Sequence, residues 1–253
     1  MQERTLWTMP KFFAPDCDLS GDSIRLSGEN AEHLKVLRVR SGERLTVSDG
    51  RGREALCEVA ELSGDSCSLR ILERGPSRGE PTVSAWVYAA LPKGDKAETI
   101  VQKSVELGAA GVVFFPSERC VSRPDGKSVA GKLSRWNRVS EAAAMQSFRG
   151  RIPEVRFLPD YESMLREAAE AGFSAFLWEE ASELSLGGLM RQKAGFRSAA
   201  LITGPEGGFS RREAEAARSA GIPAVTMGPR ILRCETAPLC ALAVLMFETG
   251  NLE

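Results

Sequence analysis

Beyond residue 82 the chain alternates six times between short apolar runs and longer amphipathic stretches. The apolar runs predict β-strands, and the amphipathic stretches predict α-helices. This alternation is typical of an α/β protein with a parallel sheet covered by helices on both faces. The expected strands are Val83–Leu91, Val112–Phe115, Glu154–Phe157, Ser174–Trp178, Ala199–Thr203 and Ala224–Met227. The expected helices are Lys96–Leu107, Gly131–Phe148, Tyr161–Ala171, Leu184–Lys193, Arg211–Ala220 and Ala237–Phe247.

The chain before residue 76 has a different pattern, in which short segments of alternating apolar and polar residues are separated by turn residues. Four such segments, at residues 23–26, 44–47, 54–59 and 66–72, predict a small antiparallel β-barrel, and one helix is expected at Asn30–Val39. The stretch 75–81 has the glycine and proline content of a linker. We therefore expect two domains, at residues 9–76 and 82–253, with residues 1–8 as an extension that carries no function.

Two glycine-containing segments follow the fifth and sixth expected strands of the second domain. Leu201–Ser210 reads LITGPEGGFS, and Met227–Ala237 reads MGPRILRCETA. Because glycine has no side chain, such loops let a ligand approach the backbone. Ser210 and Glu213 match a capping box, so a helix should begin directly after the first loop. Ligands bind beyond the carboxyl ends of parallel strands, and both loops are therefore expected to line one pocket.

The composition narrows the chemistry that this pocket can perform. His33 is the only histidine, and the six cysteines show no CxxC spacing. These counts leave almost nothing for a histidine-containing zinc site or a Ser/His/Asp group, and we expect no metal. The turn after the first strand, at residues 90–95, also lacks the GxGxxG pattern of dinucleotide-binding folds. The sequence therefore favours chemistry carried by a bound cofactor or by positioning alone.

The formal net charge of −1 argues against a protein that coats nucleic acid over its whole surface, but it permits local basic patches. One patch lies between His33 and Arg53, and it is either an RNA-binding face or an ordinary solvated one. No apolar stretch is long enough to span a bilayer, and the first residues do not look like a signal peptide. We therefore expect a soluble, cytoplasmic protein.

The two glycine-containing segments resemble the signature segments of the RsmE-type ribosomal RNA uridine-N3 methyltransferases, which belong to the SPOUT class. Further matches lie at Glu32–Arg38, Lys93–Lys96, Gln102–Gly108, Ser117–Cys120, Arg135–Trp136 and Gln146–Arg149, so the resemblance covers residues 9–251. It implies an N-terminal PUA-like β-barrel and a parallel-sheet domain whose backbone forms a trefoil knot around S-adenosyl-L-methionine. It also implies methylation of N3 of a uridine in 16S (small-subunit) ribosomal RNA, as naked RNA or within the assembled subunit.

The same resemblance assigns roles to individual residues. Those expected to bind the cofactor are Thr203, Gly204, Pro205, Glu206, Gly207, Gly208, Met227, Gly228, Pro229, Leu232, Glu235, Thr236 and Ala237. Those expected to serve catalysis are Gln146, Arg149, Arg233 and Glu206. Those expected to bind RNA are Lys11, Lys35, Arg38, Arg40, Arg119 and Arg123. Glu206 either accepts the uridine proton or caps a helix or pairs with an arginine.

The chain departs from the family pattern at Met145, Phe148 and Lys11, where the family often has an acidic residue, a small residue and an arginine. None of the three lies in the cofactor loops, so the departures bear on the choice of RNA. The last expected helix is apolar on every face, which predicts burial in the core or at a subunit interface. The resemblance implies a homodimer. Two alternatives remain, namely methylation of another RNA or ring position and a non-catalytic RNA-binding role in ribosome assembly.

Overall fold

The computed structural model describes residues 9–123 and 126–252, which form two compact units. The first unit holds residues 9–80 together with Ala144–Ile152, and the second holds Pro81–Ala143 together with residues 153–252. The sequence predicted one division, between residues 76 and 82. No change in composition marks residues 144–152, and their place in the first unit was not predicted. Residues 1–8, expected to be an extension, lie outside the described residues.

A five-stranded sheet forms the body of the first unit, in the order β1-β3-β4-β5-β2. Its strands are β1 (Lys11–Phe13), β2 (Ser23–Ser27), β3 (Arg44–Ser48), β4 (Arg53–Ser63) and β5 (Ser66–Pro76), and helix α1 (Glu29–Val36) follows β2. The ladders are antiparallel except that between β1 and β3. All four strands expected from their alternation are present. Strand β1 was missed because its three residues are all buried and show no alternation.

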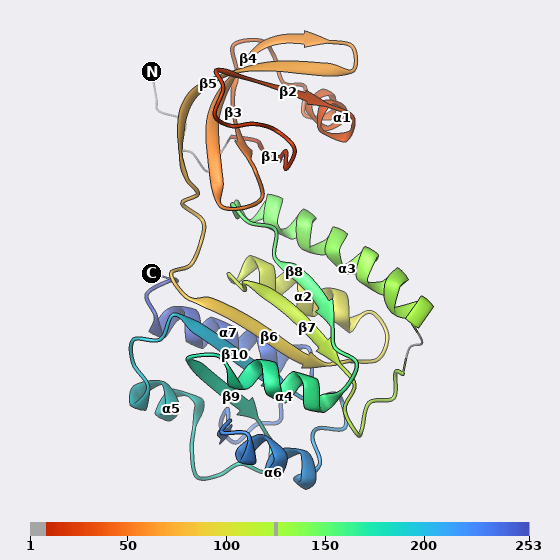
Figure 1. Cartoon of the computed structure of the whole chain (residues 1–253), viewed down its shortest axis with the longest axis vertical. Coiled ribbons are helices and arrows are strands. Elements are labelled where there is room, and N and C mark those ends of the chain that lie inside the picture. The colour runs from red at the N-terminus through yellow and green to blue at the C-terminus, as the bar shows by residue number, and fades with distance from the viewer. Residues whose placement is uncertain (1–8, 124–125, 253) are drawn as a thin grey trace. The chain divides into compact units, whose positions relative to one another are not determined.

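Six parallel strands form the sheet of the second unit, in the order β11-β9-β10-β6-β7-β8 (Figure 1). They are β6 (Ser84–Ala90), β7 (Gly111–Phe115), β8 (Glu154–Phe157), β9 (Phe173–Leu177), β10 (Ser198–Thr203) and β11 (Ala224–Val225). Every ladder between them is parallel, so the predicted parallel sheet is confirmed. Strand β11 ends earlier than expected, since Thr226 forms only an isolated bridge with Ser185.

Helices cover both faces of this sheet, with α4 in front of it and α2 and α7 behind it in Figure 1. The helices are α2 (Lys96–Glu106), α3 (Gly126–Gln146), α4 (Tyr161–Ala169), α5 (Leu186–Gln192), α6 (Arg211–Ser219) and α7 (Thr236–Glu248). Tyr88 on β6 donates a hydrogen bond to Glu167 on α4. Phe114 points to the other face, where its ring packs on Trp136 of α3 with centroids 4.6 Å apart. The sheet is therefore buried on both sides.

Helix α7, expected to be buried in the core or at a subunit interface, is only partly covered within one chain. Leu242, Leu245 and Met246 are completely buried against the rest of the second unit. Phe247, however, is 61% exposed and Val244 is 36% exposed. One chain alone thus leaves part of this apolar helix uncovered.

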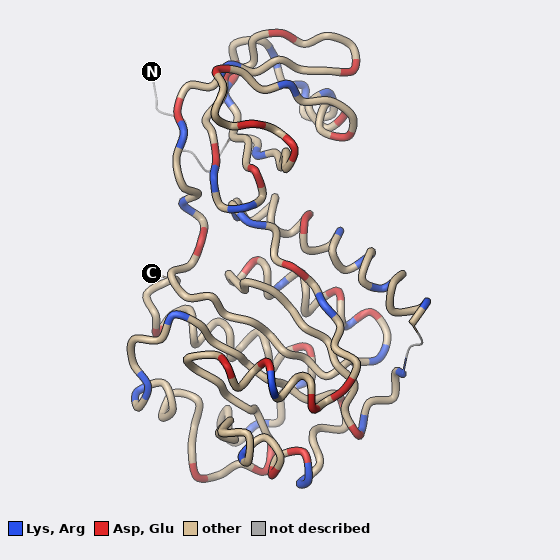
Figure 2. The backbone as a smooth tube through the Cα atoms, in the orientation of Figure 1, with Lys and Arg blue, Asp and Glu red and all other residues tan. Residues whose placement is uncertain are grey.

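Positively and negatively charged residues both occur along the backbone of each unit (Figure 2). This distribution agrees with the formal net charge of −1. None of the helices within residues 9–123 and 126–252 combines the length and the apolarity that crossing a bilayer requires.

Gly111 on β7 provides a test of how tightly the sheet is packed. A Cβ atom added there would overlap the ring of Trp86 on the neighbouring strand β6. We expect Gly111→Ala to lower the free energy of unfolding by about 1–3 kcal/mol, because the ring would have to move within a packed layer. The matched change Gly131→Ala, in α3, meets no described atom within 4 Å and should raise that free energy by about 0.5–1 kcal/mol. Urea unfolding measures both effects, and equal effects would contradict the packing argument.

Candidate functional site

A cavity of about 630 Å³ opens in the second unit at the carboxyl ends of β9, β10 and β11. Its lining comes from residues 177–179, 181–182, 203–208 and 225–234, in the three segments that continue these strands, together with Lys96 and Ala237. Because the strands are parallel, their carboxyl ends share one edge of the sheet, and loops distant in the sequence meet there. All but two of the residues expected to bind a cofactor line this cavity; the exceptions are Glu235 and Thr236.

The first loop turns sharply between β10 and α6. Gly208 has a left-handed φ of 64°, and its N–H donates to the carbonyl of Pro205 over 3.0 Å. A Cβ atom added to Gly204 would come within 3.2 Å of the ring of Phe209, so only glycine fits there without a shift. Ser210 and Glu213 bond each other's backbone N–H groups in the expected capping box. The loop is therefore compact, and its backbone forms the cavity wall.

The second loop leads from β11 to α7. Gly228 has a φ of 100°, and its N–H donates to Oγ1 of Thr226 over 3.1 Å. The carbonyl of Arg233 accepts from the N–H groups of Thr236 and Ala237, which begins the helix. The second expected loop thus faces the first across the cavity, as the sequence predicted.

Lys96, at the start of α2, joins the two loops. Its Nζ donates to Oε1 of Glu206 over 2.7 Å and lies 3.8 Å from Oε2 of Glu235. The N–H of Lys93 donates to the same Glu206 oxygen over 3.0 Å. Since one carboxylate belongs to each loop, a single ammonium group holds both loops beside the cavity.

These contacts bear on the role of Glu206. Burial alone would raise the pKa of Glu206, but the hydrogen bonds from Lys96 and from the backbone outweigh it and leave that pKa below its usual value. The hydrogen bond to Glu206 in turn raises the pKa of Lys96. A carboxylate with a lowered pKa is a weak proton acceptor. The geometry therefore favours the alternative in which Glu206 pairs with a cation, and that cation is a lysine rather than an arginine.

Two buried polar atoms in the cavity wall have no hydrogen-bond partner among the described residues, namely Oγ1 of Thr203 and Nε1 of Trp178. Leaving such a group unpaired costs about 1–3 kcal/mol, so neither atom adds to the stability of the ligand-free protein. Leu177, Val225 and Leu232 add apolar surface beside these atoms. The combination suits a ligand with a flat apolar ring and several hydrogen-bonding groups.

Trp178, Glu179 and Lys96 are among the lining residues that were not assigned from the sequence. Trp178 and Glu179 follow β9, where no glycine marks a ligand loop, and no sequence signal could have placed them in the wall. Lys96 had a usable signal, because the segment Lys93–Lys96 is one of the stretches that match the family.

The arginines expected to contact phosphates in the second unit also bind the protein. Nη1 of Arg119 donates to the carbonyl of Gly207 over 2.9 Å, and Nη2 of Arg123 donates to the carbonyl of Glu118 over 3.1 Å. Both side chains are nevertheless exposed. Arg119 therefore holds the first loop in place, and a further contact with RNA stays a prediction for both arginines.

In the first unit, the basic residues near α1 are open to solvent. Lys35, Arg38 and Arg40 are exposed, and Nζ of Lys35 lies 3.5 Å from the fully exposed carboxylate of Asp65. A pair this exposed contributes little to stability and leaves the lysine free to exchange partners. These three residues remain candidates for phosphate contacts.

Lys11 and Arg149 require a correction, because both are buried. Lys11 is 6% exposed and forms an ion pair of 2.8 Å with Glu54. Arg149 is 3% exposed and forms a two-pronged ion pair with Glu80, with distances of 3.0 and 2.9 Å. Side chains held in this way do not offer their charge to a nucleic acid. This burial argues against the RNA contact predicted for Lys11 and against the catalytic role predicted for Arg149.

The two remaining catalytic candidates are exposed but belong to different units. Gln146 ends α3 in the first unit, and Arg233 lines the cavity in the second. Across the part of the chain that the structure describes, no group of three or more His, Cys, Asp and Glu side chains could hold a metal ion.

Comparisons with known proteins all match this chain to RNA methyltransferases. A family model described as an RNA methyltransferase domain matches residues 79–246, and one described as an RNA methyltransferase PUA domain matches residues 26–72. Ribosomal RNA small subunit methyltransferase E of Mycobacterium bovis is 35% identical over 247 residues, which is 95% of this chain and 92% of the relative. The protein of the same name from Bacillus subtilis is 32% identical over 232 residues, with 90% and 91% covered.

Among solved structures, the chain resembles ribosomal RNA small subunit methyltransferase E from Neisseria gonorrhoeae bound to S-adenosyl methionine. The TM-score is 0.83 and the sequence identity 32%, and the match covers 94% of this chain and 97% of the other.

The unpaired hydroxyl of Thr203 gives a test of the polar contacts in the cavity wall. We expect Thr203→Val to raise the free energy of unfolding of the ligand-free protein by about 1 kcal/mol, because it removes a buried polar group without changing the shape. The matched change Thr226→Val removes a hydroxyl that bonds Gly228, and it should lower stability. Urea unfolding measures both variants. A loss of stability in Thr203→Val would mean that the hydroxyl has a partner within the protein.

Proposed function

The chain belongs to the RNA methyltransferase family that includes ribosomal RNA small subunit methyltransferase E, and we propose that it methylates N3 of a uridine in 16S ribosomal RNA with S-adenosylmethionine. The observation that carries this proposal is the cavity at the carboxyl ends of β9, β10 and β11, which is lined by the two glycine loops. The relatives that match almost the whole chain bear the name of this activity. The similar structure from Neisseria gonorrhoeae has S-adenosyl methionine bound.

The lining of the cavity fits such a cofactor. Leu177, Val225 and Leu232 offer apolar walls for an adenine ring. The backbone of the two glycine loops can bond its polar groups. Glu179 is an exposed carboxylate in the same wall and can pair with hydroxyls or with positive charge. When bound, the cofactor supplies an electrophilic methyl group on a sulfonium.

The chain's own contribution to the reaction is positioning and charge stabilisation. Aligning an acceptor nitrogen with a methyl donor can supply up to about 7–11 kcal/mol of the barrier in the best cases. N3 of uridine must also lose a proton, and negative charge then spreads to the uracil oxygens. Arg233, exposed in the lining of the cavity, is the residue that we propose to stabilise this charge. Glu206, which is already paired with Lys96, would hold the loop rather than take the proton.

The first unit would supply affinity for RNA. Its match to an RNA methyltransferase PUA domain supports this role, as do the exposed cations Lys35, Arg38 and Arg40. Contacts to phosphates are independent of sequence and weaken with salt. The unit would therefore hold the RNA, while Gln146 would read a base through its amide. A ribosomal RNA substrate also implies a cytoplasmic location.

We further propose that the active form is a homodimer. Phe247 and Val244 on α7 stay exposed in a single chain, and burying apolar surface of this kind is the main driving force for association. A trefoil knot in the second unit remains an expectation from the family resemblance.

The proposed activity has a direct test. Purified protein should transfer a labelled methyl group from S-adenosylmethionine to small ribosomal subunits prepared from a bacterium that lacks the family's enzyme. Mass analysis of the RNA should then find a single 3-methyluridine. Labelling at another ring position or in another RNA would identify a different methyltransferase, and cofactor binding without any transfer would favour the non-catalytic role in assembly.

Glu206→Gln tests which role this carboxylate has. We expect the variant to bind S-adenosylhomocysteine about threefold to tenfold more weakly, because it loses the ion pair that holds the first loop near Lys96. Glu215→Gln, which makes the same charge change at an exposed position of α6, is the control and should bind like the wild type. Calorimetry measures both. Unchanged binding in Glu206→Gln, combined with a large loss of methyl transfer, would restore Glu206 as the proton acceptor.

A further inference from the structure

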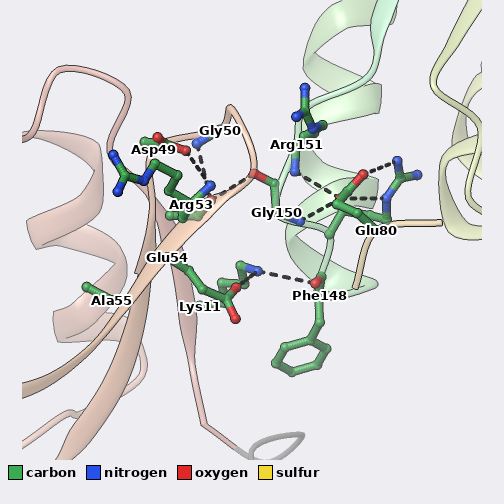
Figure 3. Close-up of polar contacts among 12 residues, drawn as sticks. Lys11, Asp49, Gly50, Arg53, Glu54, Ala55, Glu80, Phe148, Gly150 and Arg151 are labelled. Atoms are coloured by element: carbon green, nitrogen blue, oxygen red, sulfur yellow. Dashed lines mark hydrogen bonds and ion pairs between the residues drawn. The ribbon is translucent and has the colours of Figure 1, made fainter. Parts of the chain in front are cut away.

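A single carboxylate, that of Glu80, fixes three consecutive residues of the turn that follows α3. It accepts from Nε and Nη2 of Arg149 over 3.0 and 2.9 Å, and from the N–H groups of Gly150 and Arg151 over 2.8 and 3.0 Å (Figure 3). The side chains of Arg149 and Glu80 are only 4% and 18% exposed. Charge-assisted hydrogen bonds shielded from water in this way are strong. Glu80 lies in the stretch that composition marked as a linker, so its role was not expected.

Lys11 fixes the same turn from β1. Its Nζ donates to the carbonyl of Phe148 over 3.2 Å while it is paired with Glu54, as Figure 3 shows. The hydroxyl of Ser48 on β3 donates to the carbonyl of Gly150 over 2.9 Å. The turn is thus bonded on two sides by residues of the first unit.

The packing around this turn leaves no room for it to shift. A Cβ atom added to Gly79 would overlap the carbonyl oxygen of Phe148, and one added to Gly150 would overlap the side chain of Ser77. Glycine at both positions lets the turn and the segment after β5 approach each other closely. The hydrogen bonds from Glu80, Lys11 and Ser48 therefore hold a turn whose backbone is already confined by close packing.

The turn also contains a strained residue. Helix α3 ends in a Schellman motif, in which the N–H of Arg149 bonds the carbonyl of Ala144 and that of Phe148 bonds Met145. Phe148 takes the left-handed position of the motif, with a φ of 57°. This conformation costs a residue with a side chain about 1–2 kcal/mol. Such strain persists only where the surroundings hold it, and it is often found at functional sites.

Comparable helix ends in this chain use glycine instead. Helices α2, α6 and α7 end with the same pair of hydrogen bonds, and glycine takes their left-handed position, at Gly108, Gly221 and Gly250. Apart from glycines, only Phe148 and Arg38 have a positive φ among the described residues. Arg38 ends α1 in the exposed basic patch, and Phe148 stands two positions after Gln146. Both strained residues therefore lie at candidate RNA contacts.

We propose that Glu80, together with Lys11, is a positioning residue for RNA recognition. The two charges hold residues 147–151 in one strained conformation, and this conformation presents the exposed amide of Gln146 at the end of α3 to the RNA. A side chain that is already fixed loses less conformational freedom on binding, which raises affinity. Lys11 and Arg149 thereby contribute to RNA binding through the turn and not by touching phosphates. The proposal rests on the proposed function for the identity of its RNA.

The variant Glu80→Gln tests the proposal in the full-length protein. It should raise the dissociation constant for small ribosomal subunits, and the KM for them, by about tenfold, since small displacements of a recognition group are costly. The value of kcat and the affinity for S-adenosylhomocysteine should stay within about twofold of the wild type, because the cavity is in the other unit. Unchanged affinity for subunits would overturn the proposal. A parallel loss of affinity for S-adenosylhomocysteine would also overturn it, since it would indicate general damage.

A second variant and a control variant ensure that the test of the positioning role does not depend on Glu80→Gln alone. Gly79→Ala leaves the carboxylate in place but pushes on the carbonyl of Phe148, and it should weaken subunit binding in the same way. Glu58→Gln removes a carboxylate that pairs with Arg70 over 2.8 Å elsewhere in the first unit, and it should bind subunits like the wild type.

The readouts separate the two proposals. Subunit binding is measured without methyl transfer, so a wild-type protein that binds subunits but does not methylate them would refute the proposed activity alone. Wild-type methylation with equal subunit binding by Glu80→Gln, Gly79→Ala and Glu58→Gln would refute the positioning role alone.

Discussion

The parallel direction of the six strands in the second unit is the constraint on which the site depends. Because β9, β10 and β11 run the same way and are neighbours through β9, their carboxyl ends meet at one edge of the sheet. The three segments that leave these strands then face one another across a single cavity. Glycine in the loops after β10 and β11 keeps their backbone accessible. Lys96 joins these two loops through its ion pairs with Glu206 and Glu235. The pocket is therefore a consequence of the sheet direction, and its chemistry is a consequence of the loops.

Much of the charge near the expected functional residues is used to hold backbone in place. Lys96 fixes the glycine loop through Glu206, and Arg119 fixes it through the carbonyl of Gly207. Lys11 and Glu80 fix the turn after α3 in the first unit in the same manner. A reaction that depends on alignment rather than on a covalent intermediate requires rigid loops of this kind.

The sequence predicted the elements well because their signals are local. Alternation identified the strands, and the pattern of Ser210 and Glu213 located the start of α6 correctly. What it could not predict depends on contacts between distant residues. The burial of Lys11 and Arg149 follows from Glu54 and Glu80, far away in the chain, and nothing in a basic residue's own surroundings distinguishes a buried ion pair from a phosphate contact. Trp178 joins the cavity only because β9 lies beside β10 and β11. Residues 144–152 belong to the first unit through contacts with residues distant in the sequence, so no local pattern predicted their place there.

The central claim is that the loops after β9, β10 and β11 together form the site for S-adenosylmethionine. Hydrogen–deuterium exchange of the protein with and without S-adenosylhomocysteine tests it most directly, because it reports on each segment separately. The account predicts that exchange slows in peptides that cover residues 177–182, 203–208 and 226–234, with little change in the sheet of the first unit. Protection that is absent from these three segments, or that appears mainly elsewhere in the chain, would contradict it.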